Sequence, residues 1–351
     1  MRTLILCGVL TMVAATLAPG QAAQRYTIAG DNVAIYNLAG QVRVEGGPAG
    51  GIVVEMIRGG ADASKLAIQT DPIGGRSTLR VIYPDDDIIY PVMGRHSSTT
   101  LDVRDDGTFF GDARRFGNRG HRVRISGDGS GTEAYADLRI LVPPGQRIAV
   151  YLGVGKMTAT NVNGDLTLDV SSSDVTVSGI HGALMVDAGS GDVRVTDVTG
   201  NLSLDTGSGN VVVSNAKGDE LLIDTGSGDV TLDHAEARSL KIDTGSGNAD
   251  ATAVRSQDVY IDTGSGDVSV ELLAGGGSMD INTGSGQVNI TLPGDYGASL
   301  LLDTGSGEID LGGIPVTVTK LQEDHVEGRI GDGKARLHIE TGSGDVRLRK
   351  A

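Results

Sequence analysis

The tripeptide Gly-Ser-Gly recurs through the second half of this 351-residue chain at nearly constant spacing. Successive copies are separated by 18, 19, 19, 19, 20, 21 and 37 residues. Self-similarity at a period of about 20 residues is typical of folds that stack one small unit many times. The copies begin at Gly189, Gly207, Gly226, Gly245, Gly264, Gly284, Gly305 and Gly342.

Each copy lies inside a longer pattern of alternating apolar and polar residues, as in Leu202–Val213. Alternation on both sides of a glycine corner predicts two half-buried strands per unit. One unit cannot bury its apolar face alone, but stacked units can. We therefore predict an all-β protein, a parallel β-helix (β-solenoid) of 18–21-residue coils. Stacking would align Val211, Val230 and Val268 in one column, and Leu204, Ile223, Ile242 and Ile261 in another.

The repeat weakens near both ends of the chain. The doubled spacing between Gly305 and Gly342 indicates a coil that has lost its signature, around Lys320–Gly333. Upstream, the same frame fits Val150–Met157 and Ile35–Val44 without the full motif. We expect a regular β-solenoid over 141–351.

The N-terminal part is less regular. We expect residues 24–140 to form a β-rich section or cap on the solenoid, since an open end would expose a sticky strand edge. Residues 85–131 interrupt the pattern and carry several arginines among glycines. A long Arg-rich surface loop or hairpin is expected there.

Residues 1–23 have the features of a secretory signal peptide: Arg2, an apolar run over Leu4–Ala18, and small residues before the expected cleavage site. The run is short for a membrane span, and we expect no transmembrane segment in the mature chain. The only cysteine, Cys7, lies within the run, so no disulfide is expected after cleavage. The protein should be exported, to the periplasm or the cell surface.

Charge is divided unevenly along the chain. Residues 24–160 contain 16 Lys and Arg against 15 acids, whereas residues 161–351 contain 12 against 30. The formal net charge is -16. Nucleic acid is therefore excluded as a partner, because binding it rests on neutralising phosphates with cations.

The repeated string Asp-Thr-Gly-Ser matches the catalytic loop of aspartic proteases. That chemistry needs two carboxylates sharing one proton in a dry cleft, whereas here the string recurs at the coil period. We interpret each Asp as the cap of a tight turn that accepts backbone N–H groups. No catalytic residue and no cofactor-binding residue is predicted, and the protein is not expected to be an enzyme.

The same aspartates would stack one above another. Two charges about 4.8 Å apart repel by about 1 kcal/mol in water, so the column needs hydrogen bonds or counterions. No metal site is assigned, but calcium is kept as an alternative cofactor, with candidate ligands Asp205, Asp224, Asp243 and Asp262. The column after the corner instead alternates charged with neutral residues, which doubles the distance between charges: Asp192, Asn210, Asp229, Asn248, Asp267 and Gln287.

One basic and aromatic patch breaks the acidic character of the chain. It is expected either to be a folded hairpin that covers the solenoid or to contact an acidic glycan, lipopolysaccharide or a second copy. The residues for ligand contact are Phe109, Phe110, Arg114, Arg115, Arg119 and Arg122.

The Leu-x-Ile-Asp-Thr-Gly-Ser-Gly-Asp-Val units, the strand Val42–Gly46 and the step Leu141–Gly145 resemble a bacterial family of "putative adhesins", domain of unknown function 4097. The resemblance covers most of the mature chain and implies an exported right-handed β-helix. It brings no catalytic residues with it. The segment 85–131 is longer and more basic than the family implies.

These observations predict an exported, non-enzymatic adhesin-like or cell-envelope scaffold. We expect weak multivalent binding to surface polymers, with cell-surface glycans or envelope proteins as partners. Two alternatives stay open: a polysaccharide-active β-helix enzyme of the lyase or hydrolase kind, and a calcium-stabilised structural repeat. For the enzyme, residues that interrupt the repeat are scattered without a local signature: His181, Asp233, His234, Arg238, Arg255 and Tyr260.

Overall fold

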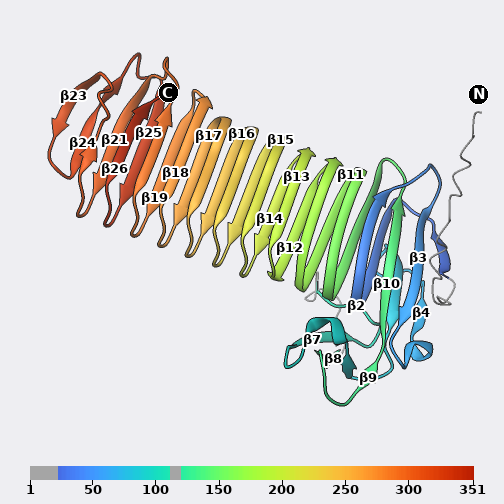
Figure 1. Ribbon diagram of the computed structural model, residues 1–351. Coiled ribbons are helices and arrows are strands. Elements are labelled where there is room, and N and C mark those ends of the chain that lie inside the picture. The colour runs from blue at the N-terminus through green and yellow to red at the C-terminus, as the bar shows by residue number, and fades with distance from the viewer. Residues whose placement is uncertain (1–22, 111–119) are drawn as a thin grey trace, which may run out of the picture.

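The computed structural model describes residues 23–110 and 120–351, and in it parallel strands lie side by side along a rod (Figure 1). The predicted signal peptide over 1–23 falls almost wholly outside the described residues. Within them, no helix has the length and apolar character to cross a membrane. The regular strands are β11 (Gln146–His181), β12 (Leu184–Ser190), β13 (Val193–Thr199), β14 (Leu202–Thr206), β15 (Val211–Thr225), β16 (Val230–Thr244), β17 (Ala249–Thr263), β18 (Val268–Ala274), β19 (Ser278–Thr283) and β20 (Val288–Leu292).

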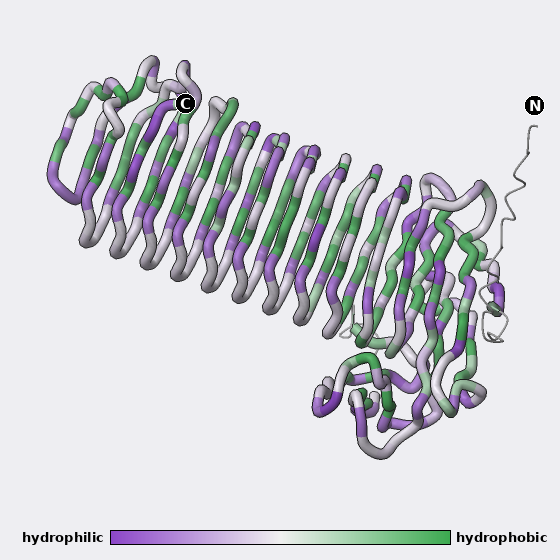
Figure 2. Tube along the Cα trace, viewed as in Figure 1, coloured by the Kyte–Doolittle hydropathy of each residue, from purple (hydrophilic) through white to green (hydrophobic). Residues whose placement is uncertain are grey.

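Aliphatic side chains form columns through the interior of the rod. Val211 pairs with Val230, Val230 with Ala249, and Ala249 with Val268. All four are at most 1% exposed, while the residues between them face outward, so hydropathy alternates along each strand (Figure 2). A buried Val or Ile contributes about 1.5–3 kcal/mol. The predicted columns are confirmed, the second one comprising Leu204, Ile223, Ile242 and Ile261.

The N-terminal strand β2 (Asn32–Gly46) lies inside the stack. One edge pairs in parallel with β11, and the other with β10 (Tyr135–Val142) and β5 (Ser77–Ile82). Antiparallel strands then cover the open end, so no regular coil edge is left free there. β2 thus joins the N-terminal section and the solenoid into one sheet. The other elements of this section are β1 (Gln24–Ile28), β3 (Ile52–Gly59), β4 (Ala67–Gln69) and the 3-10 turn η1 (Ala63–Lys65).

Within 85–131, the described residues fold into a small second sheet where a loop or hairpin was expected. β7 (Ser98–Arg104) and β8 (Gly120–Ser126) form an antiparallel hairpin, and β6 (Asp87–Ile89) joins β8 to β9 (Thr132–Glu133). We call this layer the side sheet; it projects from one flank near the N-terminal end (Figure 1). It has its own core against β2 and β11, which contains Tyr36, Leu38, Ile88, Tyr90, Leu101, Val103, Phe109, Val123, Ile125, Tyr151 and Val154. The turn η2 (Pro91–Met93) follows β6.

The last strands of the chain return into the stack. β25 (Ala335–Thr341) lies between β19 and β21 (Ala298–Thr304), in parallel with both. In the same way β26 (Val346–Lys350) lies between β20 and β22 (Ile309–Asp310). The coil that contains Gly342 therefore precedes in space the coil that contains Gly305.

The prediction of a degenerate coil around Lys320–Gly333 is wrong. β23 (Val316–Leu321) and β24 (His325–Ile330) form an antiparallel hairpin, and β24 pairs antiparallel with β21. The long spacing before Gly342 arises because the chain leaves the stack to build this hairpin and re-enters at β25. The hairpin covers the last coil, as β1 and β3 cover the first.

Candidate functional site

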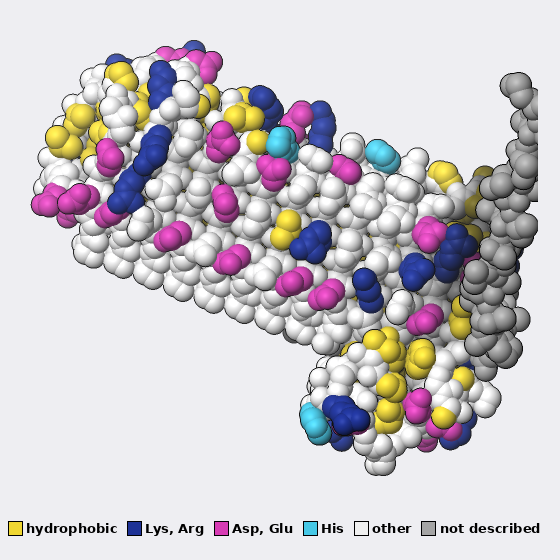
Figure 3. All heavy atoms as spheres, in the orientation of Figure 1, with side chains coloured by type: hydrophobic (Ala, Val, Ile, Leu, Met, Phe, Trp, Pro, Cys, Tyr) yellow, Lys and Arg dark blue, Asp and Glu magenta, His cyan; other side chains and the backbone are white. Residues whose placement is uncertain are grey.

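A column of acidic side chains runs along the outside of the rod, just before each corner. Figure 3 shows acidic side chains spaced along the rod, whereas hydrophobic ones gather on the side sheet and at the C-terminal end. Asp169 was not expected in the column because its corner has no glycine, and Glu340 because its coil re-enters from the C-terminus. The acid column, in spatial order, is Asp169, Asp187, Asp205, Asp224, Asp243, Asp262, Asn282, Glu340 and Asp303.

The two halves of the acid column have different surroundings. In the C-terminal half, the Lys241 Nζ lies 3.5 Å from Asp243 Oδ2, and the Tyr260 hydroxyl donates to Asp262 over 2.9 Å. In the N-terminal half, no described side chain or amide forms a hydrogen bond or ion pair with the carboxyl groups of Asp169, Asp187, Asp205 and Asp224.

Burial and mutual repulsion therefore raise the pKa values of the N-terminal carboxyls. Burial raises the pKa of Asp169 to about 7, and the charge of Asp187 adds to the effect. Burial also raises the pKa of Asp187, Asp205 and Asp224, with neighbouring carboxylates contributing at the last two. A group whose charged form is disfavoured gains from a hydrogen-bond donor or a cation. Asp187, Asp205 and Asp224 are exposed and Asp169 is half-buried, so these carboxyls face solvent without a partner among the described residues.

Side chains of the second column hold the corners together. Asn210 Oδ1 accepts the backbone N–H of Asp229 over 3.1 Å, and Asp229 Oδ1 accepts that of Asn248 over 2.8 Å. Asn248 Oδ1 accepts the N–H of Asp267 over 2.9 Å. The capping role predicted for the Asp before each corner therefore belongs to the residue after it. Among the described residues no backbone N–H donates to Asp205, which points outward.

The threonine of each Asp-Thr-Gly-Ser string is buried. Thr263 is 0% exposed, and its Oγ1 donates to the Gly247 carbonyl of the preceding coil over 3.1 Å. Thr341 donates to Gly286 in the same way, also over 3.1 Å. Thr244, Thr263 and Thr304 of these strings thus link neighbouring coils, whereas Thr206 donates to Ser208 of its own corner over 3.4 Å.

A hollow of about 560 Å³ opens where the side sheet meets the first coils. Tyr36 and Tyr151 are register partners whose rings stack with centroids 4.4 Å apart. Arg76 Nη1 donates to the Tyr151 hydroxyl over 3.3 Å. Arg104 Nη2 donates to the Phe110 carbonyl over 2.6 Å. The acid column enters the hollow, whose lining includes Tyr36, Arg76, Arg104, Asp106, Phe110, Tyr151, Asp169, Met185 and Asp187.

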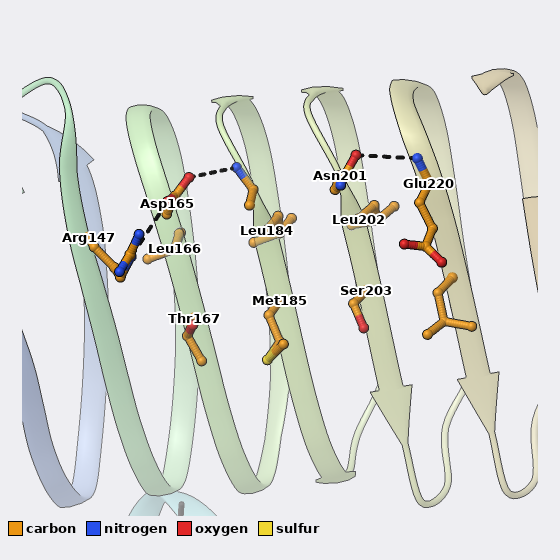
Figure 4. A pocket seen from close by; sticks show the side chains of 12 residues that line it. Arg147, Asp165, Leu166, Thr167, Leu184, Met185, Asn201, Leu202, Ser203 and Glu220 are labelled. Carbon is orange, nitrogen blue, oxygen red and sulfur yellow. Dashed lines mark hydrogen bonds and ion pairs between the residues drawn. The ribbon is translucent and has the colours of Figure 1, made fainter. Parts of the chain in front are cut away.

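A shallower groove of about 340 Å³ continues from the hollow across the next strands (Figure 4). The two cavities share Thr167 and Met185, and the Met185 side chain is 51% exposed. Arg147 lies at the end of the groove, 3.6 Å from Asp165. Hollow and groove are therefore neighbouring cavities, with Thr167 and Met185 in the lining of both.

The predicted contact residues are separated in the structure. Phe109 is 1% exposed and packs edge-on against Tyr36, so it belongs to the side-sheet core and not to a contact surface. Phe110 lines the hollow. Arg122 is exposed on β8, 3.9 Å from Asp102. The remaining three predicted residues, Arg114, Arg115 and Arg119, lie outside the described residues.

The described residues contain no group of three or more His, Cys, Asp or Glu side chains placed to hold a metal ion. The calcium candidates Asp205, Asp224, Asp243 and Asp262 each present one carboxylate per coil, stacked in register. Calcium commonly takes six to eight oxygen ligands, more than such a row supplies at one point. A calcium role for these residues stays a prediction.

Residues 136–349 match the sequence profile of a family described as Toastrack DUF4097. The chain belongs to this family. The Toastrack span starts in β10 and includes the whole acid column, but it leaves β2, β5 and the side sheet outside. The lining of the hollow therefore comes from both parts of the chain. Tyr151 and Asp169 lie within the Toastrack span, and Tyr36, Arg76 and Arg104 lie outside it.

No curated protein is detectably similar to this Toastrack chain. Three solved structures are similar over most of it. A "putative lipid binding protein" from Parabacteroides distasonis ATCC 8503 is 12% identical and covers 93% of this chain and 96% of its own, with a TM-score of 0.39. A "putative adhesin" from Bacteroides fragilis NCTC 9343 is 11% identical, with 93% and 95% covered and a TM-score of 0.30. A "putative cell adhesion protein" from Clostridium sporogenes ATCC 15579 is 11% identical, with 94% and 100% covered and a TM-score of 0.17.

Apart from Phe110, sequence reasoning missed the residues of the N-terminal section that line the hollow. One signal was available: Tyr36 and Tyr151 occupy equivalent places in the two weak repeats of the Toastrack solenoid, Ile35–Val44 and Val150–Met157. No such signal marks Arg76 or Arg104, because both lie in segments without a repeat.

Proposed function

We propose that this protein is an exported, non-enzymatic, adhesin-like scaffold of the cell envelope, periplasmic or at the cell surface. It is a right-handed β-solenoid of 18–21-residue coils that binds surface polymers weakly at many places. The observation that carries the proposal is the acid column, which repeats one kind of side chain once per coil along the rod. A linear array of weak sites binds a repetitive polymer tightly, because each contact makes the next one effectively intramolecular.

The charge of the column selects the chemistry of the partner. An acidic row repels acidic polymers and attracts chains whose units carry amines, and it accepts hydrogen bonds from hydroxyls. Cell-surface glycans with amino or hydroxyl groups therefore fit this face, and envelope proteins with basic surfaces are the other class of partner. Attachment through exposed charges should weaken with salt, since the Debye length falls from about 10 Å at 0.1 M to about 3 Å at 1 M.

The test is binding of the mature chain, from Gln24 onward, to chitosan, a neutral glucan and polygalacturonate, followed by size-exclusion chromatography. We expect co-elution with intact chitosan at low salt and its loss at high salt. Replacing Asp205, Asp224 and Asp243 by Asn should weaken it. A matched control removes the same charge from exposed acids elsewhere, Asp31, Asp295 and Glu323, and should bind normally. Separate elution of protein and every polymer would contradict the proposal.

One observation favours a second candidate function, glycan cleavage. Asp169 and Asp187 are neighbouring carboxyls with raised pKa values that line one hollow. Most glycosidases use two carboxyl groups, one protonated and one ionised. Shortening of any polymer in the same experiment would establish this function, and Asp169→Asn should then abolish the shortening.

A further inference from the structure

We propose that the hollow beneath the side sheet is a binding subsite for a single amino-sugar residue. The proposal rests on the proposed function, because the hollow lies at the N-terminal end of the acid column. It adds a defined pocket and a ligand class to what is otherwise a row of shallow contacts.

The first argument is continuity between the column and the hollow. Tyr36 and Tyr151 occupy adjacent coils, and Asp169 and Asp187 occupy the coils that follow. All four line the hollow, which also shares Met185 with the groove. A glycan lying along the acid column therefore reaches the hollow without changing direction.

The second argument is the set of hydrogen-bonding groups that line the hollow. On the solenoid wall, the carboxyls of Asp169 and Asp187 have no partner among the described residues. They can accept hydrogen bonds from an ammonium or from hydroxyl groups.

Two arginines of the lining supply donors: Arg76, directly before β5 on the solenoid, and Arg104 on β7 of the side sheet. Arg76 uses Nε for Asn32 and Nη1 for Tyr151, and Arg104 uses one N–H each of Nη1 and Nη2 for Thr108 and Phe110. A guanidinium has five N–H groups, so both arginines keep donors for ligand oxygens. The lining of the hollow thus combines acceptors with donors, and this suits a ring that carries an amine and several hydroxyls.

The third argument concerns charge and shape. A cation between Asp169 and Asp187 relieves their repulsion, whereas an anionic sugar would add to it. Phe110 and exposed Met185 give apolar surface for the C–H face of a sugar ring. The volume of about 560 Å³ lies within the range of small-molecule sites, about 300–1,000 Å³, and is generous for one lysine side chain. These features favour a sugar over a basic peptide.

The subsite can be tested by calorimetric titration with a four-unit chitosan oligosaccharide at pH 6.5, where a large share of its amines is protonated. We expect saturable binding of one oligosaccharide per protein. Asp169→Asn and Arg104→Gln should each weaken it at least tenfold. Glu323→Gln is the matched control: it removes an exposed carboxylate at the C-terminal end of the rod, outside the acid column, and should leave this binding unchanged. Thermal unfolding of each variant establishes that it is folded.

Parallel titrations separate the alternatives. Tetralysine that binds with the same dependence on Asp169 would replace the sugar by a basic peptide and overturn the proposal. Tetragalacturonate that binds better than the chitosan oligosaccharide would also overturn it. Co-elution with polymeric chitosan but no saturable binding of the oligosaccharide would reject the subsite and leave the proposed function standing. Saturable oligosaccharide binding without polymer co-elution would support the subsite and contradict the proposed function.

Discussion

The imidazole Nδ1 of His325 lies 2.5 Å from Oδ1 of Asp303, the last member of the acid column. The antiparallel register of β24 and β21 places the two residues opposite each other. His325 Nε2 also lies 3.2 Å from Oε1 of Glu327 on its own strand. The hydrogen bond to Asp303, and to a lesser degree the one to Glu327, raises the pKa of His325 above its usual value. A titratable hydrogen bond between His325 and Asp303 therefore joins the β23–β24 hairpin to the last coil of the rod.

This contact predicts that the β23–β24 hairpin loosens as the pH rises. A histidine whose pKa is raised on folding stabilises the folded state. This contribution is fully present below the pKa of the unfolded state, near 6.5, and is lost as the pH rises through the pKa of the folded state. Amide exchange of residues 316–330, corrected for the intrinsic pH dependence, should accelerate between pH 6 and pH 9. His325→Gln should remove most of the change. An unchanged pH profile in this variant would show that the contact does not hold the hairpin.

Asp169 gives a second pH prediction, with its own variant. Its folded pKa of about 7 exceeds the unfolded value of about 4, so the native state binds more protons between these values and stability falls as the pH rises through that window. Asp169→Asn removes the cost of the buried charge and should stabilise the protein at pH 8 by roughly 1 to 4 kcal/mol. The gain should vanish near pH 4. Urea unfolding at both pH values tests this, with exposed Asp31→Asn as a control that should change little at either.

The repeat predicts the middle of the fold but not the order of strands at its ends. Leu184 pairs with Leu202, and Leu202 with Leu221, at the offsets that the Gly-Ser-Gly spacing predicts. Met279, in contrast, pairs with Leu337, which lies 58 residues later. Every coil presents the same alternating apolar strand, so any coil can stack on any other. The order is decided by the connecting hairpin, which has no repeat signature.

The candidate site also has one part that the repeat predicts and one part that it does not. The acid column follows from the periodic Asp before each corner. The hollow depends on the side sheet packing over Tyr36 and Tyr151, a tertiary contact between a repetitive and a non-repetitive segment. Arg76 and Arg104 reach it from segments in which spacing carries no information. The sequence pattern also pointed to the wrong arginines. It indicated an exposed basic patch that included Arg122, whereas Arg76 and Arg104 line the hollow.

The second glycine of each Gly-Ser-Gly corner should be irreplaceable. Gly247 has φ 150°, and a Cβ there would lie 2.1 Å from the Gly228 carbonyl oxygen of the preceding coil. Gly247→Ala must shift the backbone that stacks the coils, and we expect a loss of at least about 2 kcal/mol in chemical unfolding. Gly276→Ala is the control, because nothing lies within 4 Å of its Cβ. Equal losses in the two variants would contradict the packing argument.

Calcium should act on the acid column only as a diffuse counterion if no discrete site exists. A ligand that binds the folded state alone raises the melting temperature with its concentration. We expect 5 mM CaCl₂, added to chelator-treated protein, to change the melting temperature no more than MgCl₂ at the same ionic strength. A calcium-specific rise that Asp224→Asn abolishes would instead support the calcium-stabilised repeat.

The alternation of charge after the corner should be needed for stability at low salt. Asn248 stands between Asp229 and Asp267, and its Nδ2 donates to Asp229 Oδ1 over 3.1 Å. Asn248→Asp replaces this donor with a carboxylate and creates three consecutive acids about 4.8 Å apart. Each new neighbour pair repels by about 1 kcal/mol in water and by more near a protein surface, so a loss of roughly 1 to 3 kcal/mol is expected.

Salt distinguishes repulsion from lost hydrogen bonding in this variant. At 1 M NaCl the Debye length of about 3 Å is shorter than the distance between coils, so Asn248→Asp should recover most of its stability. Asn248→Ala adds no charge and removes both side-chain hydrogen bonds, the one donated to Asp229 and the one accepted from the Asp267 N–H, so its loss should persist at both salt concentrations. If the two variants lose equal stability with equal salt dependence, the column is arranged for hydrogen bonding alone. If only the Asp variant recovers, the alternation of Asp and Asn keeps like charges two coils apart.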